Sequence, residues 1–170
     1  MHMDADLLSC LESSDALVIF GPATHSRTET LCISHPLPPN LPNLNVTVAR
    51  IDTPRGDMPI PLSNGGKALR YREVLEGSAN PILTDQQGGS VAVQNGKTVY
   101  LGAYLEDETL IQFYNHLMTE TNIETLKLPQ GLRKRVTKTE EFWFNYDCET
   151  METPHGTLEP AGVLRVPRKR

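Results

Sequence analysis

A run of prolines constrains the fold of this chain more than any other feature of its sequence. Seven of them fall from residue 36 to residue 61. Proline lacks a backbone N–H and clashes with the preceding helical turn, so regular helix is excluded over most of that stretch. Within it, only Val46 to Ile51 has the alternation that predicts a strand. The prolines are Pro36, Pro38, Pro39, Pro42, Pro54, Pro59 and Pro61.

Helices and strands are predicted on both sides of this stretch. The apolar run Ala16 to Phe20 is typical of a strand buried on both faces, as in parallel sheets. Asn95-Gly96 predicts a two-residue hairpin turn, because both central positions of such a turn need a positive φ. The periodicity also predicts helices at 4–13 and 106–121, strands at 81–83, 90–94 and 99–101, and a strand or helix at 68–76.

The character of the chain changes after Pro129. Short strands joined by polar turns are predicted at 131–136, 141–146 and 162–166, which indicates a small antiparallel β module. We therefore predict two domains, residues 1–126 and residues 127–170.

Composition argues against several classes of partner. A net charge of −5 disfavours nucleic acid, and the basic run 133–135 and the basic tail 165–170 have no aromatic residues interleaved in the sequence. Apolar runs are too short to cross a bilayer, and no secretory leader opens the chain. The odd number of cysteines, without metal-ligand spacing, favours a reducing, cytoplasmic setting. We expect no nucleic acid, no membrane, no metal and no cofactor.

No catalytic residue is predicted. Cys32 and His35 lie close in sequence, but a proline-rich loop does not project a strained nucleophile. Glycoside cleavage needs two carboxylates, about 5 Å apart in a retaining enzyme, and no pair here has a strong case. Glu73 and Glu76 share a face only in a helix and then resemble surface residues. Trp143 could stack on a sugar ring, although such residues are more often part of a core.

Several segments, taken in order, resemble the C-terminal half of family 42 β-galactosidases. ALVIFGPATHSRT at 16–28, GGKALRYREVLEGSANPIL at 65–83 and SVAVQNGKTVYLGAYLEDETLIQFYNHL at 90–117 are similar to that family's trimerisation domain. LPQGLRKRV, EEFWFNYD and LEPAGVLRV are similar to its small C-terminal β domain. The order and spacing of the set carry the resemblance, which covers nearly the whole chain.

The resemblance implies a fold and a structural role. The expected fold is α/β, a truncated layer domain like class I glutamine amidotransferases and flavodoxin, followed by the small antiparallel β module. In the family both catalytic glutamates lie in a (β/α)₈ barrel, and a barrel of about 250 residues does not fit into this chain. The implied function is that of a non-catalytic region that associates subunits and braces the barrel.

Two kinds of partner follow from the resemblance. An incomplete parallel sheet would leave an exposed edge near residues 17–20, and such an edge invites pairing with another chain. We therefore expect a homo-oligomer, for which a trimer is one candidate, or docking on a β-galactosidase catalytic barrel. The alternative is a carbohydrate-binding or stand-alone interaction module, with sugar or partner contacts at Trp143, Tyr146 and Tyr104.

Overall fold

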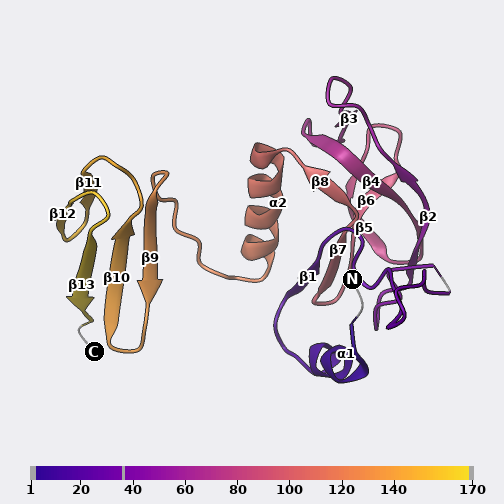
Figure 1. The fold of residues 1–170 in the computed structure, drawn as a ribbon, viewed down its shortest axis with the longest axis horizontal. Helices are drawn as coiled ribbons and strands as arrows, with labels where there is room; N and C mark the ends of the chain where they lie inside the picture. The colour runs from indigo at the N-terminus through magenta and orange to yellow at the C-terminus, as the bar shows by residue number, and fades with distance from the viewer. Residues whose placement is uncertain (1–2, 36, 169–170) are drawn as a thin grey trace. The chain divides into compact units, whose positions relative to one another are not determined.

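The computed structural model describes residues 3–35 and 37–168, and it divides into two compact units, Met1–Ile123 and Glu124–Arg170 (Figure 1). The first unit contains α1 (Ala5–Glu12), β1 (Val18–Phe20), β2 (Val46–Asp52), β3 (Ile60–Pro61), β4 (Lys67–Gly77), β5 (Asn80–Thr84), β6 (Ser90–Asn95), β7 (Thr98–Leu101), β8 (Ala103–Leu105) and α2 (Asp107–Glu120). The second contains β9 (Leu132–Val136), β10 (Glu140–Asn145), β11 (Met151–Thr153), β12 (Gly156–Leu158) and β13 (Val163–Pro167).

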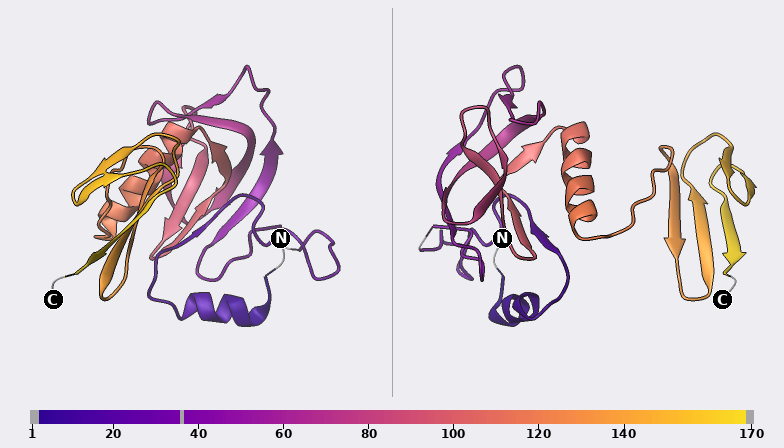
Figure 2. Two further views of the ribbon diagram at one scale, coloured as in Figure 1. Left: turned by 60° about the vertical axis from the view of Figure 1, so that its left-hand side comes forward. Right: turned by 180° about the vertical axis from the view of Figure 1, so that it is seen from behind.

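One sheet organises the first unit. Its strand order is β1-β7-β6-β4-β2, with β3 and β8 paired to β4 and β5 paired to β6. Only the pairing of β1 with β7 is parallel among the described strands. Figure 2 shows α1 beyond one end of these strands.

The prediction of an α/β, flavodoxin-like layer domain is wrong. Such a fold needs parallel strands joined by crossover helices. Here β5, β6 and β7 follow one another through short turns, which force antiparallel pairing, β4 also pairs antiparallel with β6, and the described residues contain only two helices. The apolar run at 16–20 misled the prediction, because its one parallel neighbour, β7, arrives through a series of antiparallel strands.

The local signals in the sequence were more reliable than the fold class. The Asp4 side chain caps α1, and its Oδ1 accepts the Leu7 N–H at 2.7 Å. The hairpin of β6 and β7 is confirmed, but its turn is shifted by one residue. Asn95 pairs with Thr98, so the loop is Gly96 and Lys97, and of these two only Gly96 has a positive φ. That is the pattern of a type II′ turn.

Two apolar cores lie in the first unit and one in the second. Val99 and Leu101 belong to the first core, whereas Tyr100, between them on β7, belongs to another. Since successive residues of a strand face opposite sides, the sheet is covered on both faces. The second unit has a three-stranded sheet of order β13-β10-β9 and a hairpin of β11 and β12, packed around Leu132, Trp143 and Leu158. Among the described residues, neither helix has the length and apolarity needed to cross a membrane.

Candidate functional site

Strand β4 carries two adjacent charged residues into the interior of the first unit. Arg72 and Glu73 are both buried, and their side chains point to opposite faces of the sheet because they are consecutive on a strand. A buried charge is costly unless it is paired or hydrogen-bonded. Each of these residues therefore has to be the centre of a polar network, and each is.

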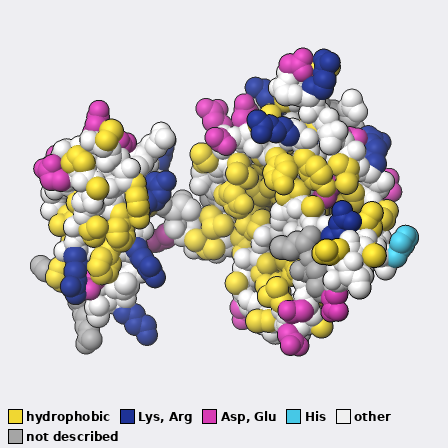
Figure 3. Space-filling model, viewed as in Figure 1, with side chains coloured by type: hydrophobic (Ala, Val, Ile, Leu, Met, Phe, Trp, Pro, Cys, Tyr) yellow, Lys and Arg dark blue, Asp and Glu magenta, His cyan; other side chains and the backbone are white. Residues whose placement is uncertain are grey.

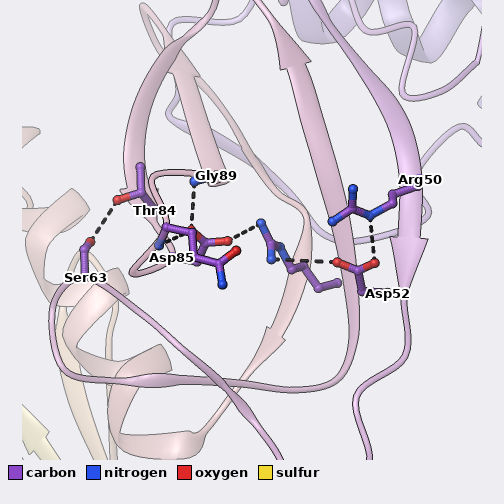
Figure 4. A network of polar contacts seen from close by, with 8 residues as sticks. Arg50, Asp52, Ser63, Thr84, Asp85 and Gly89 are labelled. Atoms are coloured by element: carbon purple, nitrogen blue, oxygen red, sulfur yellow. Dashed lines mark hydrogen bonds and ion pairs between the residues drawn. The ribbon is translucent and has the colours of Figure 1, made fainter.

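Arg72 forms ion pairs with two aspartates, Asp52 and Asp85, both of which are labelled in Figure 4. Its Nη2 lies 2.5 Å from Asp85 Oδ2, and its Nη1 lies 3.8 Å from Asp52 Oδ2. The Arg72 and Asp85 side chains are only 7% and 6% exposed, so solvent screens this pair poorly. Arg50 extends the network, since its Nε donates to Asp52 Oδ1 at 3.0 Å.

The surroundings of Asp85 keep it ionised. Burial by itself raises the pKa of the carboxyl, but the backbone N–H groups of Gly89 and Gln87 and the Arg72 guanidinium outweigh it and lower the pKa. Both N–H groups donate to Oδ1 at 2.8 Å. A general acid in glycoside cleavage needs a raised pKa instead. The aspartates beside Arg72 therefore suit a structural ion pair better than acid–base catalysis.

A cavity of about 570 Å³ lies beside this network. Arg50, Asp52, Arg72 and Asp85 line it together with Pro54, Pro59, Ile60, Pro61, Gln86 and Gln87. The Nε of Arg72 is buried and has no hydrogen-bond partner. Two carboxylates already share this guanidinium, so the site does not offer an anion a free cationic partner.

Glu73 is the centre of the second network. Its Oε1 accepts the Tyr71 hydroxyl at 2.8 Å and the Ala23 N–H at 3.0 Å, and its Oε2 accepts the Tyr100 hydroxyl at 2.5 Å. Burial, and then the neighbouring carboxylate, raise the pKa of both tyrosines. The tyrosines therefore remain hydrogen-bond donors. The bond from Ala23 fixes the loop that follows β1 against the sheet.

Glu73 also lines a cavity of about 350 Å³ with a largely apolar wall, to which Ile33, Val48 and Ile51 contribute. Among the described residues that line it, Glu73 is the only carboxylate. Glycoside cleavage by the two-carboxylate mechanism needs an acid on each side of the bond. Glu73 alone therefore does not provide that chemistry.

The three aromatic residues singled out from the sequence lie in different surroundings. Trp143 is 2% exposed in the core of the second unit, with Lys134 Nζ 5.0 Å from its ring centroid. Tyr104 on β8 is 57% exposed, and Tyr146, directly after β10, is 73% exposed. A sugar or partner contact at these positions stays a prediction, for which only the two tyrosines have exposed rings.

Sequence reasoning missed both buried networks. It treated Glu73 and Glu76 alike as surface residues, but of the two glutamates only Glu76 is exposed. The available signal was the Arg72-Glu73 pair inside a run of strand-forming residues, where charges on both faces need partners. Cys32 shows no catalytic arrangement, since its Sγ lies 3.8 Å from the Thr30 carbonyl oxygen and the side chain is exposed. No cluster of three or more His, Cys, Asp or Glu in the described chain could hold a metal ion.

Comparison with known proteins gives relatives of one kind. No protein-family model matches the chain. A β-galactosidase of Thermus thermophilus is 32% identical over 154 residues, which are 88% of this chain and 24% of the relative. β-Galactosidase BgaA of a Thermus species is 31% identical over 155 residues, with the same two shares. The chain thus spans about a quarter of the length of these relatives.

Solved structures agree with the sequence relatives. The β-galactosidase of the psychrophilic Marinomonas ef1 matches 99% of this chain with 28% of its own, at a TM-score of 0.85 and 27% identity. The family 42 β-galactosidase Gan42B matches 99% of this chain with 30% of its own, at a TM-score of 0.73. That second likeness, at 16% identity, shows the fold alone. Nearly the whole chain is therefore similar to about a quarter of a β-galactosidase, and its fold is that of the matching part of the family 42 enzyme Gan42B, in agreement with the resemblance seen in its sequence.

Proposed function

We propose that this chain is a non-catalytic region of a β-galactosidase, which associates subunits and braces the catalytic barrel. The observation that carries the proposal is the size of the match: 99% of this chain superposes on only 28% of the Marinomonas β-galactosidase. A barrel of about 250 residues does not fit into 170 residues. Hydrolysis of terminal β-galactosides would be the work of the complete enzyme.

The charged networks support a structural role. Asp85 is tied to Arg72, and Glu73 accepts three hydrogen bonds from its own chain. Both carboxylates thus hold loops on the sheet. Asp52 lines the same cavity as Asp85, but the Arg72 guanidinium contacts both aspartates.

Strand β1 supports a role in association. It is the last strand on its side of the sheet, and β7 is its only partner among the described strands. The Val18 N–H donates to the Lys97 carbonyl on the β7 side, so the N–H of Ile19, the next residue, faces the open edge. An edge strand with free N–H and C=O groups is a template for pairing with another chain.

Two measurements on the purified chain test the proposal. We expect no hydrolysis of a nitrophenyl β-galactoside, and a molar mass by light scattering that is a multiple of 18.9 kDa. Turnover at enzyme-like rates would overturn the non-catalytic role, and a monomer at every concentration would overturn association. Ile19→Pro should weaken edge pairing because it removes the N–H that faces the open edge. Ile19→Ala is the control, because it also removes the isoleucine side chain but keeps that N–H.

A further inference from the structure

The outer face of the three-stranded sheet in the second unit combines aromatic and arginine side chains. Phe142, Phe144 and Tyr146 alternate along β10 and continue beyond its end, so they share one face. Their rings are nearly parallel, with centroids 6.4 Å apart for the first pair and 6.2 Å for the second. Trp143, between them, points to the opposite face and into the core.

Arginines flank this row on both neighbouring strands. Phe142 lies opposite Arg135 on β9 and Arg165 on β13, and Phe144 lies opposite Arg133 on β9. Residues directly opposite each other on paired strands share a face. We call the set Phe142, Phe144, Tyr146, Arg133, Arg135 and Arg165 the aromatic–arginine face. The basic run at 133–135 thus has aromatic residues beside it in space that the linear sequence does not show.

The composition of this face is that of a binding surface. Arginine and aromatic residues are enriched in protein interfaces and among the residues that contribute most to binding. All three arginines are exposed, and the Tyr146 ring is exposed as well. Arg165 already pairs with Glu140, so the charge available to a partner comes from Arg133 and Arg135. In Figure 3 this unit shows a hydrophobic strip with basic side chains beside it.

Charge identifies what would bind there. The segment Glu124–Arg170 has nine lysines and arginines against seven aspartates and glutamates, a net charge of +2. The whole chain has −5, so residues 1–123 carry −7. Any second copy of the chain therefore brings an acidic first unit to the basic second unit.

Helix α2 has the matching surface. Its sequence, DETLIQFYNHLMTE, contains acidic residues but no lysine or arginine. Ile111 and Tyr114 are exposed on it although they are apolar or aromatic, and Glu108 lies one helical turn before Ile111. The helix thus offers an apolar surface bordered by carboxylates, which complements aromatic rings bordered by guanidinium groups.

We infer that the aromatic–arginine face of one copy binds the exposed side of α2 of a second copy. The contact is head-to-tail, since the two surfaces differ, and a head-to-tail contact that closes on itself gives a ring such as a trimer. The inference rests on the proposed role in association and adds a second surface, besides the edge of β1, at which it occurs. The carboxylate at Glu108 faces arginines in this contact.

Charge reversal tests the contact in the full chain by sedimentation velocity over a range of concentrations. Arg135→Glu and Glu108→Arg should each raise the dissociation constant at least about tenfold, and the double variant should recover much of the loss. Lys138→Glu, in the exposed connection between β9 and β10, makes the same charge change at a residue that is not part of the face, and it should have little effect. Tyr146→Ser, which removes the most exposed ring of the face, should weaken association as well.

The outcomes separate this inference from the proposed function. If Ile19→Pro alone dissociates the chain and the face variants associate normally, association stands and the aromatic–arginine face is not its surface. If Arg135→Glu and Lys138→Glu weaken association equally, the effect comes from the net charge of the chain and not from the face, and the inference is overturned. A wild-type chain that stays monomeric overturns both proposals. Circular dichroism of each variant verifies that it is folded before its association is measured.

Discussion

Replacing Asp85 with Asn should destabilise the first unit strongly. The substitution keeps the shape and an oxygen for the Gln87 and Gly89 N–H groups, but it leaves the Arg72 guanidinium buried beside an amide. Removing one partner of a buried ion pair costs about 3–5 kcal/mol. A loss within that range is expected, because both side chains are more than nine-tenths buried and Asp52, 3.8 Å from the guanidinium, compensates its charge only in part.

A double-mutant cycle separates the charge effect from lost packing. Arg72→Met with Asp85→Asn removes both charges, so it should cost less than the sum of the two single changes. Urea unfolding followed by far-ultraviolet circular dichroism and by hydrogen exchange of residues 67–105 measures the first unit. Asp57→Asn is the control, since Asp57 pairs with Arg55 and both are exposed. A loss below about 1 kcal/mol for Asp85→Asn, or additive losses in the cycle, would refute the reasoning.

Three further predictions concern the same two networks. Gly89→Ala should destabilise the first unit, because a Cβ there would lie 2.5 Å from the Arg72 guanidinium. Gly21→Ala is the control, since a Cβ at Gly21 meets nothing within 4 Å, and thermal unfolding compares the two variants. Tyr100→Phe should cost about 1–3 kcal/mol in urea unfolding, since it removes a buried donor from Glu73. The lowered pKa of Asp85 stabilises the fold above about pH 4. The difference in unfolding free energy between wild type and Asp85→Asn should therefore shrink as the pH falls through the folded-state pKa of Asp85. A difference that is unchanged at about pH 2 would contradict this.

Local signals in this sequence predicted helices and the hairpin well. They did not predict the strand pairing of the sheet or the contacts between residues distant in sequence. The hairpin near Gly96 and the two helices follow from residue types at fixed short spacings. The α/β prediction failed because the run at 16–20, whose strand does pair in parallel with β7, says nothing about the other strands of the sheet, which pair antiparallel. The candidate networks depend on contacts across 13 residues, from Arg72 to Asp85, and across 27, from Glu73 to Tyr100. No periodicity encodes such distances.

Burial of both Arg72 and Glu73 follows from a sheet that is covered on its two faces. Consecutive residues of a strand point to opposite faces, so Arg72 and Glu73 each point into the covered side of a different face. Each charge is neutralised or hydrogen-bonded by a turn or loop on its own side: the Asp85–Gly89 turn on one face and the loop at Ala23 on the other. These polar groups thus hold irregular segments onto a sheet that lacks covering helices over much of its surface. Loops anchored to a sheet in this way are what we expect of the bracing role proposed above.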